Sequence, residues 1–143
     1  MSRILSIDYG RKRTGIAVTD PAQIIATGLT TVATGELMKF LTEYMRREPV
    51  ERVVLGLPTQ TDGSPSENQP RVRSFAGQFR KAFPGVPLDF YDERFTSVLA
   101  HQAMLDGGLR RMERRNKALV DEISATILLQ SYMEARRIRN KRI

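Results

Sequence analysis

Apolar residues recur along the chain with two different periods, and the change of period predicts the order of the elements. Short aliphatic or β-branched runs predict five strands, at 4–8, 16–18, 29–33, 50–57 and 86–91. Apolar residues at helical spacing predict helices, at 35–47, from a cap at Ser66 to about Phe83, at 98–105 and at about 118–136. Three leading strands followed by alternating helices and strands are typical of an α/β domain, in which a mixed sheet has helices on both faces.

The second helix carries the most local signals. Ser66 and Gln69 have the spacing of a capping box, which predicts the start of the helix. Pro70 is compatible only with its first turn. Three aromatic residues fall on one face of this helix, Phe75, Phe79 and Phe83. We interpret this stripe as core rather than as a platform for stacking bases.

The stretch 4–20 predicts a β-hairpin with a carboxylate at its mouth. Its first apolar run ends on Asp8, and Gly10 and Gly15 bracket a basic turn, Arg11-Lys12-Arg13-Thr14. An unpaired charge beside a buried strand is unfavourable, and a metal ion would compensate it. The basic turn suits a substrate with phosphate groups. Alternatively, backbone N–H groups of its own turn could satisfy Asp8.

Two further acids lie at the ends of predicted elements. Glu93 follows the last strand, and Asp121 precedes Ala125 by four residues, so that it continues the apolar face of the last helix. If these ends meet Asp8, they form an all-oxygen site suited to Mg²⁺ or Mn²⁺, and two such ions could activate water against a phosphate. Alternatively, Glu93 could pair with Arg94, and Asp121 could be an ordinary first-turn residue that the helix dipole stabilises.

Length and composition limit the class of protein. The 143 residues predict one domain spanning 1–143. The chain has no cysteine, which excludes thiolate zinc sites and cysteine nucleophiles and is typical of a reducing compartment. No run approaches the ~18 apolar residues of a membrane span, and no signal-peptide pattern opens the chain, so we predict a cytoplasmic protein without membrane contact. The single histidine, His101, is interpreted as a helix-surface residue.

The net charge of +7 is concentrated near the end of the chain. From Arg110 onward there are ten lysines and arginines against four acidic residues. They fall in a segment at about 107–117, which we expect to be a loop, and in a tail at about 136–143. This asymmetry favours a polyanionic partner bound through salt-sensitive phosphate contacts, although a solvated basic tail is the simpler alternative.

Four blocks of sequence together resemble the YqgF family, whose members are described as nucleases for pre-16S rRNA or for Holliday junctions. The blocks are Ile7-Asp8-Tyr9-Gly10 with Lys12-Arg13 and Gly15-Ile16-Ala17, then Leu55-Gly56-Leu57-Pro58 with Asp62-Gly63-Ser64, then Asp92-Glu93-Arg94-Phe95-Thr96-Ser97, and finally Lys117 with Asp121 and Ala125. The first block also resembles the opening of sugar kinases and chaperone ATPases. All four in this order are specific, and they cover nearly the whole chain.

The resemblance implies a ribonuclease H-like fold and assigns residue roles. It implies a catalytic metal site, formed by Asp8, Glu93 and Asp121. It places basic motif positions near the substrate phosphates, namely Lys12, Arg13, Arg94 and Lys117. We add the arginines of the basic segment as nucleic-acid-binding residues, Arg110, Arg111, Arg114 and Arg115. Ser124 fills the place of the family's small residue before the alanine, and the neighbouring acids Asp92 and Glu122 are alternative ligands.

The resemblance further implies a metal-dependent endonuclease for structured nucleic acid. Water activated by Mg²⁺ or Mn²⁺ would attack the phosphate in line and leave a 5′-phosphate and a 3′-hydroxyl. The favoured substrate is the 5′ end of pre-16S rRNA, and the alternatives are a four-way DNA junction or RNA binding without cleavage. An actin-like ATPase is the other class considered, but it requires two such lobes. We expect a monomer or a weak homodimer, since symmetric cutting of a junction needs two sites.

Overall fold

The computed structural model describes residues 2–60, 62–96 and 117–141. Five strands form one sheet, β1 (Arg3–Tyr9), β2 (Arg13–Thr19), β3 (Ala26–Ala33), β4 (Val50–Leu57) and β5 (Leu88–Asp92). Their spatial order is β3-β2-β1-β4-β5. The β1–β2 and β2–β3 pairs are antiparallel, whereas the β1–β4 and β4–β5 pairs are parallel. The predicted mixed five-stranded sheet is therefore confirmed.

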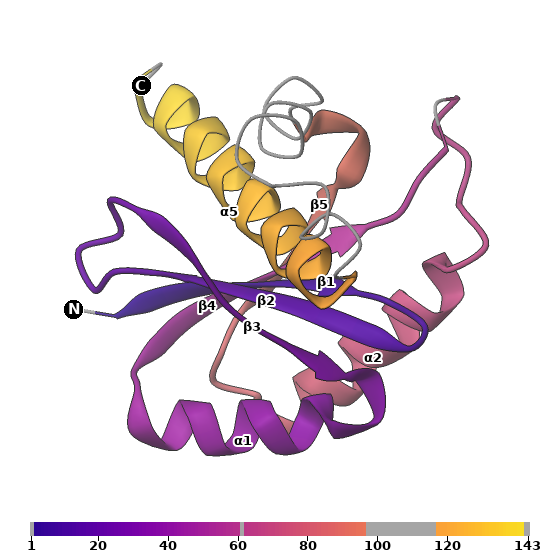
Figure 1. Ribbon diagram of the computed structural model, residues 1–143. Helices are drawn as coiled ribbons and strands as arrows, with labels where there is room; N and C mark the ends of the chain where they lie inside the picture. Colours follow the sequence, from indigo (N-terminus) through magenta and orange to yellow (C-terminus); the bar gives the residue numbers. More distant parts are fainter. Residues whose placement is uncertain (1, 61, 97–116, 142–143) are drawn as a thin grey trace.

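Helices cover both faces of this sheet, as predicted (Figure 1). Helices α1 (Leu37–Arg47) and α2 (Gln69–Ala82) lie on one face, and the long helix α5 (Lys117–Lys141) crosses the other. The alternation of side chains along β1 explains this arrangement. Leu5 packs into the core with α1 and α2, whereas Ile4 packs with Leu128 and Leu129 of α5. Two short 3₁₀ turns, η1 (Thr34–Glu36) and η2 (Glu93–Phe95), follow β3 and β5.

The aromatic stripe of α2 belongs to the core, as predicted. Phe75 and Phe79 are almost fully buried. Neighbouring rings follow one another along the helix, with centroids 6.3 Å apart for Phe75 and Phe79 and 5.0 Å apart for Phe79 and Phe83. Tyr9, next to Asp8 on β1, extends the row, with its ring centroid 5.2 Å from that of Phe75. The stripe thus holds the end of β1 against α2.

The predicted capping box is wrong. The residue before the first turn of α2 is Asn68, which makes no side-chain capping bond, and the hydroxyl of Ser66 has no hydrogen-bond partner among the described residues. The Gln69 side chain instead donates to the carbonyl of Pro58 and accepts from Arg73. Tertiary bonds to the preceding loop therefore replace the local motif.

Several element ends also differ from the sequence prediction. Strand β2 begins at Arg13 and β3 at Ala26, earlier than predicted, because pairing between neighbouring strands extends both. Strand β5 starts later, at Leu88, and α5 continues to Lys141. The predicted helix at 98–105, His101 and most of the basic segment at 107–117 lie outside the described residues. None of the described helices is long and apolar enough to cross a membrane.

Candidate active site

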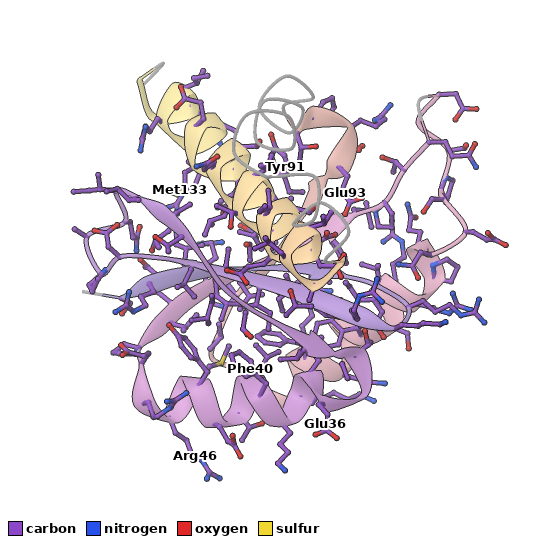
Figure 2. The ribbon with its side chains drawn as sticks, in the orientation of Figure 1. Glu36, Phe40, Arg46, Tyr91, Glu93 and Met133 are labelled. Carbon is purple, nitrogen blue, oxygen red and sulfur yellow. The ribbon has the colours of Figure 1, made fainter. Side chains whose placement is uncertain are left out.

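Asp8 and Glu93 lie together at one edge of the sheet. Strands β1, β4 and β5 run parallel, so their carboxyl ends share this edge. Asp8 is the penultimate residue of β1, and Glu93 directly follows β5 (Figure 2). The two carboxyl groups are within hydrogen-bonding contact of each other. They line a pocket of about 210 Å³ whose other wall is α5, with Ser124 and Leu128.

Gly56 of β4 leaves room for the carboxyl group of Glu93 to approach Asp8. A β-carbon at this position of β4 would lie 2.6 Å from Oε1 of Glu93 and 3.2 Å from Cδ2 of Leu128. The glutamate side chain therefore crosses the strand at a point where only glycine leaves room. Gly56 was not among the predicted site residues. The sequence does place a glycine inside the apolar strand 50–57, and glycines in strands often mark points where another group approaches the backbone closely.

Replacing Gly56 by alanine is expected to reduce nucleic-acid cleavage about tenfold or more with little loss of stability. The new methyl group displaces a flexible carboxylate rather than backbone, so the free energy of unfolding should fall by no more than about 1 kcal/mol. A displacement of about 1 Å is enough to affect catalysis strongly. Cleavage rates and urea denaturation would be compared with Gly35→Ala, where an added β-carbon has no neighbour within 4 Å. Equal activity of the two variants would contradict this role of Gly56.

The Asp8–Glu93 pair favours a bound cation. Partial burial raises the pKa of Glu93, and the charge of Asp92 raises it further, whereas the bond with Asp8 lowers it. Two carboxyl groups in contact cannot both ionise without cost, and a cation bound between them would compensate that cost. Carboxylate oxygens are the ligands that Mg²⁺ and Mn²⁺ prefer. The donor set at this edge therefore fits a hard divalent ion.

Asp121, on α5, lies over the β1–β2 hairpin and has a different partner. Its Oδ2 accepts a hydrogen bond of 2.9 Å from Nε of Arg13, at the start of β2. Its backbone carbonyl rests against Gly15, which pairs with Asp8 across the hairpin. Among the described residues no group of three acidic, histidine or cysteine side chains is close enough to hold a metal. The structure brings Asp8 and Glu93 together, and it pairs the third predicted acid with a predicted phosphate-binding arginine.

Hydroxyl groups of the sheet fix the first turns of α5 above this edge. Ser6, fully buried on β1, donates to the carbonyl of Ala125 over 2.7 Å. Thr31 on β3 donates to the carbonyl of Ala118 over 2.5 Å. These bonds place the start of the helix across the hairpin, which sets the position of Asp121.

The two neighbouring acids point elsewhere. Asp92 accepts bonds from the backbone N–H and the guanidinium of Arg94, at 2.8 to 3.0 Å, and from the hydroxyl of Thr59. The bonds from Arg94 are the main reason that the pKa of Asp92 is lowered to about 2. Glu122 lies over Gly28 of β3, where a β-carbon would be 2.8 Å from its Cγ. Arg94 therefore pairs with Asp92 and not with Glu93.

The turn between β1 and β2 is basic, exposed and well held. Arg11 and Lys12 are exposed at its tip. The hydroxyl of Thr34 donates to the carbonyl of Gly10 over 2.7 Å, and its backbone N–H donates to the carbonyl of Lys12 over 3.0 Å. The turn is thus fixed to η1, close in sequence to both Asp8 and Arg13. The predicted contacts Arg110, Arg111, Arg114 and Arg115, and the side chain of Lys117, lie outside the part of the chain that the structure describes.

The order β3-β2-β1-β4-β5, the long crossing helix and the paired acids at the ends of β1 and β5 define a ribonuclease H-like protein. A search of solved structures agrees. RuvC of Thermus thermophilus, solved in complex with a Holliday junction substrate, matches with a TM-score of 0.55 and 16% identity, over 94% of this chain and 96% of RuvC. At this level of identity the match shows the fold.

Sequence comparison gives the family. The model of RuvX, described as Holliday junction resolvase, matches residues 2–135, and the chain belongs to this family, which is also called YqgF. A relative from Phocaeicola vulgatus is 61% identical over 96% of this chain and 99% of its own length. One from Bacteroides fragilis is 58% identical over 96% and 100%. Both are named "Putative pre-16S rRNA nuclease".

Proposed function

We propose that this protein is a metal-dependent endonuclease for structured nucleic acid that trims the 5′ end of pre-16S rRNA. The observation that carries the proposal is the contact between Asp8 and Glu93 in an open pocket, beside a basic turn. The names of the relatives support rRNA as the substrate. We further propose that it acts in the cytoplasm, as a monomer or a weak homodimer.

Asp8 and Glu93 would hold the Mg²⁺ or Mn²⁺ ion, and Asp121 is the further carboxylate proposed for the same site. When bound, the ion would polarise the scissile phosphate and activate water for in-line attack. Asp121 can act as a ligand of this site only if Arg13 releases its carboxylate and binds another anion instead. A substrate phosphate is suitable, since guanidinium groups bind carboxylates and phosphates with the same geometry.

The remaining residues bind and orient the substrate. Arg11 and Lys12 would contact phosphates next to the scissile one, from a turn that is already fixed by Thr34. The walls of the pocket, Ile127 and Leu128 of α5, limit water around the carboxylates. The product would carry a 5′-phosphate and a 3′-hydroxyl.

Cleavage of two labelled substrates tests the proposal. A precursor-rRNA fragment and a four-way DNA junction would be incubated with Mg²⁺, with Mn²⁺ and with EDTA. We expect metal-dependent cutting of the RNA, reduced at least about a hundredfold by Asp8→Asn, since even residues behind metal ligands contribute 10- to 100-fold. The matched control is Glu36→Gln, an exposed acid on the opposite face of the sheet (Figure 2).

The other outcomes identify the alternatives. Cutting of the junction alone would favour resolvase activity, the description of the family model and the substrate bound to the structural neighbour. Binding of RNA without cutting by either wild type or Asp8→Asn would favour a non-catalytic RNA-binding factor.

Affinity for RNA should weaken with salt in a way that depends on the basic turn. Each phosphate contact contributes about one unit to the slope of log affinity against log salt concentration. Arg11→Ala combined with Lys12→Ala should therefore lower this slope by roughly two. Lys39→Ala, an exposed lysine on α1, should leave it unchanged. Fluorescence anisotropy between 50 and 300 mM salt measures the slopes, and equal slopes would remove the turn from the binding surface.

A further inference from the structure

The turn between β2 and β3 is organised by one carboxylate. Oδ1 of Asp20 accepts the backbone N–H groups of Ile24 and Ile25, both over 2.7 Å, and Oδ2 accepts that of Ala22 over 3.2 Å. The bond from Ile25 contributes most to lowering the pKa of Asp20, so the carboxylate is charged at neutral pH. The backbone N–H of Asp20 also donates to the carbonyl of Ile25. The turn is therefore fixed before any partner arrives.

The backbone of Gln23 also indicates that its surroundings hold this turn in one conformation. Its φ angle is 59°, in the left-handed region that residues other than glycine rarely adopt. Its side chain donates to the carbonyl of Ser2 over 2.8 Å, which ties the turn to the start of β1. Backbone strain of this kind persists only where the surroundings impose it, and it is common at binding sites.

The fixed turn presents two large apolar side chains to solvent. Ile24 and Ile25 are each 63% exposed. Single exposed apolar residues are ordinary, but an adjacent pair on a rigid turn is a pre-ordered contact, which loses little conformational entropy when a partner covers it.

A hollow beside the pair extends the surface onto α5. It has a volume of about 290 Å³ and lies between the two isoleucines and the side chains of Met133 and Arg137. The guanidinium of Arg137 donates to the carbonyl of Ile24 over 3.3 Å, so helix and turn form one continuous surface. We call this set, Ile24, Ile25, Met133 and Arg137, the turn–helix surface.

The rim of the turn–helix surface is positively charged. Arg136, Arg137 and Arg139 lie on the same end of α5, against two acids, Glu134, paired with Arg137 at 3.4 Å, and Asp20 of the turn. An apolar centre with a charged rim is the usual composition of a protein interface. Isoleucine offers no ring for a base to stack on, which favours a protein over a nucleic acid.

This surface is remote from the Asp8–Glu93 pair. Asp8 pairs with Gly15 of β2, and the turn begins at Asp20, five residues further along the chain, a rise of roughly 17 Å at about 3.4 Å per residue. Figure 1 shows the final turns of α5 on the side of the molecule where the N-terminus lies, away from the carboxyl end of β5. A partner bound there would leave the pocket open.

We propose that the turn–helix surface docks a segment of another protein that is acidic and carries large apolar side chains. The apolar side chains would cover Ile24 and Ile25, and its carboxylates would pair with the arginines of the rim. This inference goes beyond the nuclease function and does not depend on it.

Photocrosslinking tests the proposal in the full-length protein. A photoreactive phenylalanine derivative would replace Ile25, and the same derivative in place of Lys39 on α1 is the matched control. After irradiation in the native host, mass spectrometry would identify the peptide joined to position 25. We expect a segment of another protein with net negative charge and at least two large apolar side chains, with at least a tenfold lower yield when Arg137→Glu is added.

A synthetic copy of that segment provides the second measurement. It should bind Ile24→Ser/Ile25→Ser at least tenfold more weakly than wild type, and a copy with its apolar residues changed to serine should lose binding to wild type equally. Because both isoleucines are exposed, the double variant should keep the wild-type melting temperature. Crosslinks to RNA, crosslinks to a second copy of this chain, or a yield no higher than at position 39 would each overturn the proposal.

Discussion

Replacing Glu93 by glutamine should reduce cleavage at least about a hundredfold and, without metal, stabilise the protein at neutral pH. Loss of activity follows from loss of a proposed metal ligand. The gain in stability follows from the raised pKa of Glu93, caused mainly by burial. Ionising this carboxyl costs more in the folded than in the unfolded chain, so wild type is destabilised as pH rises from the ordinary value of about 4.3 through the raised one. Glutamine removes that cost.

The difference in stability between wild type and Glu93→Gln should depend on pH. Well below pH 4 both states carry a protonated Glu93, so the two proteins should differ little in free energy of unfolding. Above the raised pKa the difference should reach a plateau in favour of Glu93→Gln. Urea denaturation from pH 3 to 8 in EDTA measures it, with Glu36→Gln as the control that shows no such trend. Added Mg²⁺ should stabilise wild type more than the variant. A Glu93→Gln protein that cuts normally, or is less stable at pH 8, would contradict the assignment.

Replacing Gly15 by alanine should destabilise the protein by about 2 to 3 kcal/mol, more than Gly56→Ala. The β-carbon would collide with the backbone carbonyl of Asp121 and lie 3.0 Å from the backbone nitrogen of Glu122. Backbone atoms cannot rotate away as the end of a side chain can. Helix α5 must therefore move off the sheet and carry Asp121 with it, so cleavage should fall as well.

Gly77→Ala is the matched control for this change. Gly77 lies inside α2, where an added β-carbon has no neighbour within 4 Å. Because alanine is the better helix former, this variant should gain about 0.5 to 1 kcal/mol. Urea denaturation of both proteins measures the two opposite shifts. A Gly15→Ala protein as stable as wild type would show that α5 can tolerate a wider spacing from the hairpin.

Proposed functional residues and structural residues alternate at the edge where β1, β4 and β5 end. Asp92 and Glu93 are neighbours in sequence, yet the first fixes Arg94 and Thr59 and the second faces Asp8. This division follows from the turn into η2 directly after Asp92, which sends consecutive side chains in different directions. The environment lowers the pKa of one acid and raises that of the other. Only the second is suited to receive a cation, because the first already has its counterion.

The sequence by itself determined the order of the described strands and helices, the aromatic core stripe of α2 and the acids at the ends of β1 and β5. These features follow from hydrophobic period and from charges next to apolar runs, both of which are local in the chain. Element ends were less predictable because pairing with neighbours extends β2 and β3, and the capping box failed because Gln69 bonds to the loop at Pro58.

Only the tertiary structure decided which side chains meet. Asp8 contacts Glu93 because β4 places their strands two positions apart and Gly56 leaves room between them. Asp121 faces Arg13 because the hydroxyls of Ser6 and Thr31 fix the start of α5 over the hairpin. The exposure of Ile24 and Ile25 likewise depends on a turn held by Asp20. These contacts join residues distant in the sequence or depend on backbone direction, which residue type and spacing do not specify.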